Sequence, residues 1–152
     1  MNRLLLSSLG LAALLAGCAT NRLGDDERLA LYRAHAAAPV REFQYFNRLS
    51  GWTALGDSAL AVWTRPNQAY LLELSGRCAD LDFAPAIAIT HFGDRVSARF
   101  DDVLVLGGGP GAIRLPCRIQ SIRQLDVKAL RTSEKELREA KVQERAQQAP
   151  GG

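Results

Sequence analysis

The stretch "SALAVWTRPNQAYLLELS", residues 58–75, decides the fold class of this chain. Two mainly apolar runs, Ser58–Thr64 and Ala69–Ser75, enclose the polar segment Arg65–Gln68. Pro66 stands at the second position of that segment, which is typical of a type I turn. Because short strands joined by a tight turn pair antiparallel, the stretch predicts a β-hairpin in the middle of the chain.

Similar signals on either side of this hairpin predict more short strands. Gly56-Asp57 and Gly93-Asp94 are two-residue hairpin signals. The other expected strands are Val40–Asn47, Trp52–Leu55, Ala86–Phe92, Arg95–Phe100, Val103–Leu106 and Ile113–Ile119. A sheet of about seven such strands must curl or fold over to bury one face. The sequence therefore predicts a mainly β fold, a small antiparallel meander that forms a partly closed barrel or a compact sandwich.

Helices are expected before and after the strands. The acidic run Asp25–Glu27 opens an N-terminal helix that should end at about Ala37, before Pro39. The segment Ser133–Glu136 matches a capping box, which predicts a C-terminal helix from about Glu134. The apolar stripe of this second helix is thin, so we expect it to be exposed.

The first residues are typical of an export signal. Arg3 gives a weakly positive start, and the apolar run Leu4–Leu15 is too short for a membrane helix, which needs about 20 residues. The stretch Leu15-Ala16-Gly17-Cys18 resembles the lipobox of bacterial lipoproteins, which implies cleavage before Cys18 and a lipid on its thiol. In such lipoproteins, an aspartate directly after the lipidated cysteine favours the inner membrane. This chain has Ala19 there, so the resemblance implies the outer membrane with the domain facing the periplasm. An ordinary secretory signal cut after Ala19 is the alternative.

These features divide the chain into four parts. They are a signal peptide (1–17), a lipidated tether (18–25), a β-rich domain with an N-terminal helix (26–125) and a charged helical tail with a disordered end (126–152).

Loss of Arg3 leaves 18 of the 19 basic residues against 16 acidic ones, so the mature net charge is +2. A nucleic-acid binder would concentrate a strong basic excess on one face. We therefore expect membrane attachment through the lipid and contacts with envelope proteins, but no nucleic acid.

Two cysteines remain after the proposed lipidation site. Cys117 lies on the inward face of an alternating run, and Cys78 shares the phase of Leu72 and Leu74. An even pair of cysteines in an oxidising compartment predicts a disulfide. A zinc site that adds His35 and His91 is the alternative, but no pair has the usual ligand spacing.

Other residues that could carry chemistry have ordinary structural explanations. Trp52, Trp63 and Tyr70 could line a groove for a glycan or peptide, although aromatic residues in a small β domain are mostly core. His91 shares the parity of inward residues and could act as a base. The aspartates that could join it are Asp80, Asp82, Asp101 and Asp102, whose default role is in turns. The glycine-rich run at 107–111 lacks the ending of a phosphate-binding loop, so we expect a hairpin loop there.

The stretches "VREFQYF", "YLLELSGRCADL", "RFDDVLV" and "CRIQSIRQLD" resemble an uncharacterised family of small proteobacterial envelope lipoproteins. The resemblance spans roughly residues 40 to 126 and implies structural roles for Cys78, Cys117 and Asp101. We expect a non-catalytic, lipid-anchored envelope protein that acts through protein contacts and needs no metal or cofactor. The alternatives are a binding module with the aromatic groove and, third, a hydrolase in which His91 converges with carboxylates.

Overall fold

The computed structural model describes residues 23–107 and 115–148. The predicted signal peptide, Cys18 and most of the predicted tether lie outside these residues. Most of the glycine-rich run at 107–111 also lies outside them, and so do the last four residues. Gln147 and Gln148, directly before those four residues, belong to a helix.

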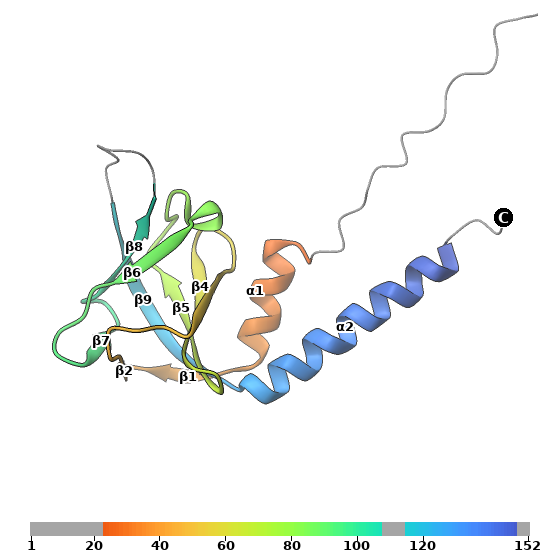
Figure 1. Ribbon diagram of the computed structural model, residues 1–152, viewed down its shortest axis with the longest axis horizontal. Coiled ribbons are helices and arrows are strands. Elements are labelled where there is room, and N and C mark those ends of the chain that lie inside the picture. The colour runs from red at the N-terminus through yellow and green to blue at the C-terminus, as the bar shows by residue number, and fades with distance from the viewer. Residues whose placement is uncertain (1–22, 108–114, 149–152) are drawn as a thin grey trace, which may run out of the picture.

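Seven strands form one curled antiparallel sheet with the shape of a half-barrel (Figure 1). In spatial order six of them are β3 (Gly51–Ala54), β4 (Ala59–Arg65), β5 (Gln68–Leu74), β9 (Pro116–Leu125), β8 (Asp102–Leu106) and β6 (Ala86–Ile89). The seventh, β1 (Ala36–Val40), pairs with the part of β9 that β8 leaves free. The mainly β class is confirmed, and of its two alternatives the partly closed barrel is present.

The hairpin predicted over residues 58–75 is present as β4 and β5, which only Pro66 and Asn67 separate. The two glycine turns are also present. Gly56 and Gly93 have φ angles of +85° and +57°, which glycine adopts without steric cost. The turn at Gly56 joins β3 to β4 as predicted. Gly93 also lies in a tight turn, which a bridge between Phe92 and Arg95 closes. The hairpin predicted around it is wrong, because β6 pairs with β8 and Arg95–Ser97 pairs with Glu42–Gln44.

A small two-stranded ribbon packs over the inner face of the sheet. It consists of β2 (Glu42–Gln44) and β7 (Arg95–Ser97), and we call it the β2–β7 ribbon. The single strand predicted over Val40–Asn47 is therefore wrong, because the chain bends at Arg41 between β1 and β2. This bend carries the chain from the large sheet to the ribbon.

Two hydrophobic clusters lie on the two faces of the sheet. The inner cluster contains fully buried strand residues such as Leu60, Leu72 and Ile122, and the ribbon covers it with Phe43, Tyr45 and Val96. The short 3₁₀ helix η1 (Leu81–Phe83) adds Leu81 to the same cluster. The inside of the half-barrel is thus filled by side chains.

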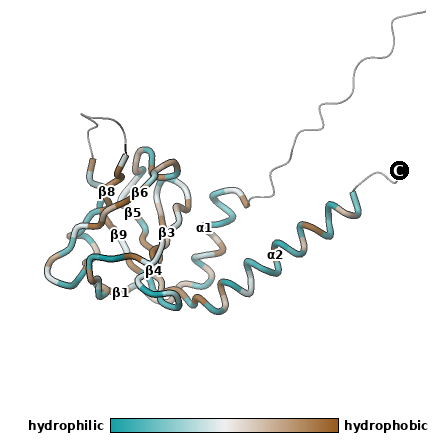
Figure 2. Tube along the Cα trace, viewed as in Figure 1, coloured by the Kyte–Doolittle hydropathy of each residue, from teal (hydrophilic) through white to brown (hydrophobic). Residues whose placement is uncertain are grey.

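Two helices, α1 (Asp25–Ala34) and α2 (Val127–Gln148), cover the outer face of the hairpin. Ala59, Ala61 and Ala69 present small side chains there, which lets the helices approach closely. The helices contribute Leu29, Tyr32, Val127 and Leu130 to this outer cluster. Figure 2 shows that α2 beyond its first turns is largely hydrophilic, as expected for an exposed helix. Among the described residues, no helix is long and apolar enough to cross a bilayer.

The N-terminal helix ends earlier than predicted. It stops at Ala34 rather than at about Ala37, and β1 begins at Ala36. Pairing with β9 favours the extended conformation, and Pro39 is tolerated because β1 is an edge strand. A partner strand far away in the sequence therefore determined where the helix ends.

The C-terminal helix begins earlier than predicted, at Val127 rather than near Glu134. The carboxylate of Asp126 accepts a hydrogen bond from the Ala129 N–H at 2.9 Å, which caps the first turn. Ser133 is instead an interior helix residue, and its hydroxyl lies 2.9 Å from Nε2 of His35. The first turn of α2 is thus part of the domain core.

Candidate functional site

The structure joins Cys78 and Cys117 in the predicted disulfide, with their Cα atoms 5.6 Å apart. Cys78 follows β5 and is fully buried in the inner cluster, and Cys117 belongs to β9. Both sulfur atoms are used in the bond, so the cysteine–histidine zinc alternative is excluded. The disulfide is a structural crosslink between the loop after β5 and the long strand β9.

The three aromatic residues of the expected groove do not share one face of the sheet. Trp52 pairs with Val62, and Val62 pairs with Tyr70, so Trp52 and Tyr70 lie on the inner face. Trp63 follows Val62 and points to the outer face, where it packs edge-on against Tyr32. Because adjacent residues of a strand face opposite sides, these aromatic side chains do not form one groove.

His91 lies on the surface instead of pointing inward. The strand predicted over Ala86–Phe92 ends at Ile89, so the alternation does not reach the histidine. Its Nδ1 lies 2.7 Å from the carbonyl oxygen of Gly93, which is a backbone atom and not a carboxylate. Across residues 23–107 and 115–148, His, Cys, Asp and Glu side chains form no group of three or more that could hold a metal ion.

Asp101 is the buried charged residue of the described chain, and its carboxylate is satisfied by hydrogen bonds. One oxygen accepts the Ser97 N–H at 2.7 Å, and the other accepts the Thr90 hydroxyl at 3.0 Å. The neighbouring Asp102 forms an ion pair with Arg118 at 2.8 Å. These aspartates therefore hold the β7–β8 turn in place, in agreement with a structural role.

This turn replaces the second half of the strand predicted over Arg95–Phe100. The strand β7 ends at Ser97, and Arg99 adopts a positive φ of 70°, which is uncommon for a residue other than glycine. Alternation along the strand predicted over Arg95–Phe100 would place Phe100 on the face of Val96, but Phe100 is 77% exposed and Val96 is fully buried. The Asp101 hydrogen bonds thus present Arg99 and Phe100 on a fixed turn.

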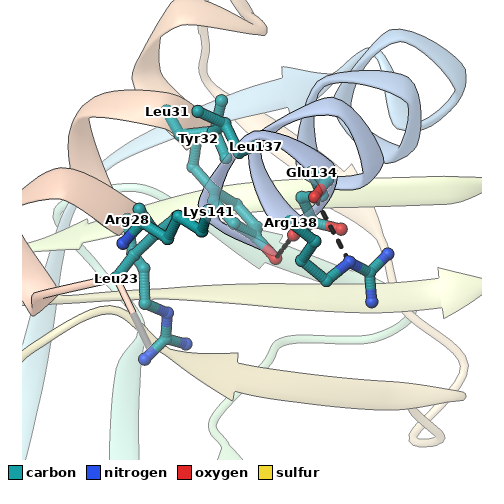
Figure 3. A pocket seen from close by; sticks show the side chains of 8 residues that line it. All are labelled: Leu23, Arg28, Leu31, Tyr32, Glu134, Leu137, Arg138 and Lys141. Carbon is teal, nitrogen blue, oxygen red and sulfur yellow. Dashed lines mark hydrogen bonds between the residues drawn. The ribbon is translucent and has the colours of Figure 1, made fainter. Parts of the chain in front are cut away.

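A cleft of about 350 Å³ lies between α1 and α2 (Figure 3). Arg28 donates to the Ala54 carbonyl oxygen of β3 at 2.9 Å, and the other polar side chains bond to groups within the two helices. The Tyr32 hydroxyl donates to Glu134 at 3.0 Å, and Lys141 lies 3.9 Å from Glu27. Arg138 donates to the Glu134 carbonyl oxygen one turn earlier in α2. The bonds of Tyr32 with Glu134 and of Lys141 with Glu27 therefore hold α2 against α1, and we call this contact the helix seam.

Burial raises the pKa of the Tyr32 hydroxyl far above its ordinary value of 10.0, and the negative charge of Glu134 raises it further. The nearby Arg28 opposes this effect. Tyr32 is therefore a neutral hydrogen-bond donor in the seam across the physiological pH range.

Exposed phenylalanines surround the β2–β7 ribbon. Four of the five phenylalanines of the chain are exposed by 58% or more, whereas Phe43 is buried. Phe46 follows β2 by two residues, Phe92 precedes β7 by three, and Phe100 follows β7 by three. Exposed apolar patches are typical of contact surfaces, and here three large exposed rings border one small ribbon.

Two surface hollows lie beside the ribbon, one at each end of β2. The first, the Arg41/Arg99 hollow of about 710 Å³, also contains Glu42 and Phe100. The second, the Arg48/Arg65 hollow of about 270 Å³, also contains Gln44 and Phe46. No buried residue of the inner cluster lines either of these two hollows. We define the ribbon surface as the outer side of the β2–β7 ribbon together with these two hollows and the exposed Phe46, Phe92 and Phe100.

The amino-acid sequence alone gives little indication of this surface. The only available signal was the position of the phenylalanines next to polar turn residues, as in Phe92 before Gly93-Asp94. That signal is weak, because a phenylalanine at the end of a predicted strand is more often counted as core.

Comparison with known proteins places the chain in a family. Residues 1–141 match the family of unknown function DUF6491. The chain belongs to the DUF6491 family. No curated protein and no solved structure matched the chain.

The match to DUF6491 includes every residue of the ribbon surface and of the helix seam. It begins at residue 1, before the apolar run Leu4–Leu15, and ends at Lys141, the last residue that lines the cleft between α1 and α2. The expectation of an uncharacterised family is therefore confirmed.

Proposed function

We propose that this DUF6491 protein is a lipid-anchored envelope protein, attached to the outer membrane through Cys18, that acts through protein contacts made by its ribbon surface. The observation that carries the proposal is the set of exposed phenylalanines at both ends of the β2–β7 ribbon. Their exposed fractions are 58% for Phe46, 91% for Phe92 and 77% for Phe100. Burial of such side chains by a partner would be favourable by about 25 cal/mol per Å² of apolar surface.

The leader and the disulfide support the location. The lipobox-like stretch Leu15–Cys18 ends an apolar segment that falls within the family match. The disulfide between Cys78 and Cys117 fits an oxidising compartment such as the periplasm. A lipid on Cys18 would hold α1, which begins at Asp25, within about 25 Å of the membrane, because an extended chain spans at most ~3.6 Å per residue.

The filled interior of the half-barrel favours protein contacts over small-molecule binding. A ligand-binding barrel would keep an apolar cavity with a few convergent polar groups. Here the inner cluster occupies that space, and Tyr70 is buried within it. The aromatic groove and the hydrolase therefore have no specific observation in their favour.

Metabolic labelling with a fatty-acid analogue tests the anchor. We expect the wild-type chain to be labelled and recovered with outer-membrane fractions, and Cys18→Ser to lose the label because no thiol remains at the lipidation position. Equal labelling of both chains would contradict the anchor.

Photocrosslinking in intact cells tests the contact surface. A photoreactive phenylalanine analogue at Phe92 should give a discrete crosslinked species of larger mass. The matched control is Val142, an exposed apolar residue in the second half of α2. Figure 1 shows that this helix runs away from β2 and β7 toward its C-terminal end. Crosslinks that form equally at both positions, or at neither, would contradict a specific ribbon contact.

A further inference from the structure

We propose that the ribbon surface binds an extended acidic segment of its partner protein. This inference rests on the proposed function and adds the chemistry of the partner. It follows from the arginines that line the two hollows, because their guanidinium groups have no ion-pair partner among the described residues.

The guanidinium groups of Arg41, Arg48, Arg65 and Arg99 form no ion pair and no hydrogen bond with any residue in the described ranges. All four line the two hollows beside the ribbon. Elsewhere in those ranges, arginines have partners within the chain. These include the pairs Arg33 with Glu73, Arg77 with Asp57, Arg95 with Glu42 and Arg118 with Asp102.

The charge of both hollows is therefore positive. The single acidic residue lining them is Glu42, and its carboxylate is paired with Arg95. The Arg48/Arg65 hollow is lined by no acidic side chain at all among the described residues. Two arginines without counterions in each hollow are complementary to carboxylates, which guanidinium groups bind with two parallel hydrogen bonds.

The spacing of the hollows favours an extended segment. Glu42 lines the first hollow and Gln44 lines the second, and these residues are two positions apart on β2. That separation is about 7 Å along a strand. A peptide of a few extended residues can thus place carboxylates in both hollows. The methylene groups of the same acidic side chains would contact Phe46 and Phe100, which are the exposed phenylalanines of the hollows.

The turn that carries Arg99 is held rigidly for such a contact. The Arg99 N–H donates to the Ile119 carbonyl oxygen at 2.6 Å, and Arg118 donates to the Arg99 carbonyl oxygen at 3.0 Å. Asp101 closes the same turn, because its carboxylate accepts the Ser97 N–H at 2.7 Å. Because the backbone of Arg99 is already held, only its side chain loses conformational freedom when it binds, which lowers the entropic cost of the contact.

Peptide binding to the purified full-length chain tests the inference. The probe is a short fluorescent peptide of alternating Glu and Leu, and the control probe has Lys in place of Glu. We expect the acidic probe to bind and the basic one not to bind. Arg41→Gln with Arg99→Gln should weaken binding by about tenfold or more, and rising salt should weaken it further. Lys128→Gln with Lys135→Gln removes the same charge from α2 and should leave binding unchanged.

Several outcomes would overturn the inference. They are equal binding of both probes, unchanged binding by the Arg41 and Arg99 variant, and equal loss in the α2 control. Binding to phosphatidylglycerol vesicles in place of the acidic peptide, lost in the same Arg41 and Arg99 variant, would also overturn it in favour of a lipid surface. If crosslinks from Phe92 persist in that variant at unchanged yield, the acidic partner is excluded while the proposed contact function stands. If Phe92 gives no crosslink in the wild type, the proposed function fails as well.

Discussion

The Phe43 ring of the β2–β7 ribbon stacks on the Tyr70 ring of β5, with centroids 4.5 Å apart and planes inclined by 19°. Both side chains are buried, at 3% and 8% exposure. This contact joins the small ribbon to the inner face of the half-barrel. It explains how a ribbon of two three-residue strands keeps a fixed position, since a hairpin alone is marginally stable in water.

We expect Phe43→Ala to lower the free energy of unfolding by about 3–5 kcal/mol, because it removes a large buried ring and leaves a cavity. Urea unfolding followed by tryptophan fluorescence measures this change. Phe92→Ala is the matched control, because Phe92 is 91% exposed and its truncation should change stability by no more than about 0.5 kcal/mol. Equal losses in the two variants would contradict the buried role of Phe43.

The disulfide should be the largest single constraint on the unfolded chain. Cys78 and Cys117 are 39 residues apart, and the chain-entropy model gives about 4 kcal/mol for a loop of this length. Replacing both cysteines by alanine should therefore shift the urea midpoint strongly downward. Reductant should produce a similar shift in the wild type and none in the double variant. A wild-type midpoint that does not respond to reductant, with intact mass showing reduced thiols, would contradict this role.

The start of α2 gives a local test. Asp126→Ala should cost about 1 kcal/mol, because the Ala129 N–H loses its capping carboxylate, and Asp126→Asn should cost much less. Hydrogen exchange distinguishes this cap from the Ser133 capping box that the sequence suggested. Exchange of the Ala129 amide should accelerate in Asp126→Ala and stay unchanged in Ser133→Ala. The reverse result would restore the later helix start.

Some features depend on local patterns and others on distant contacts. The hairpin over residues 58–75 and the turns at Gly56 and Gly93 depend on alternation and turn residues that lie close together in the sequence. The disulfide joins residues 39 apart, and it was predictable because the chain holds two cysteines besides Cys18. The end of α1 depends on a distant segment, because Ala36 pairs with Leu125. The start of α2 has a local signal, the Asp126 cap, which the later capping box at Ser133 obscured.

The positions of the candidate site residues also depend on information that local sequence patterns do not contain. Alternation along the strands places Trp63 and Tyr70 on opposite faces only if the pairing register of β4 and β5 is known. A shift of that register by one residue would exchange the two faces of the sheet. The ribbon surface was missed for another reason. An arginine without a counterion is indistinguishable in the sequence from an arginine with one, and only the folded chain shows that Arg41 and Arg99 have none within the described residues.

The seam between α1 and α2 predicts a dependence of stability on alkaline pH. Burial, and then the charge of Glu134, raises the pKa of Tyr32 in the folded chain above the ordinary value of 10.0 that the unfolded chain retains. The stabilisation by the neutral hydroxyl is therefore fully present below about pH 10 and decreases as the pH rises above it, because the unfolded chain then releases the proton first. Urea unfolding at about pH 8 and about pH 11 measures the decrease.

Tyr32→Phe isolates the contribution of this hydroxyl. At about pH 8 the variant should lose about 1 kcal/mol with the hydrogen bond to Glu134. Its stability should then fall less steeply than that of the wild type between the two pH values, because one tyrosine with a raised pKa is gone. Tyr45 and Tyr70, whose pKa values burial also raises, remain in both chains and cancel in the comparison. Parallel pH profiles for the two chains would show that the Tyr32 hydroxyl ionises as readily in the folded chain as in the unfolded one.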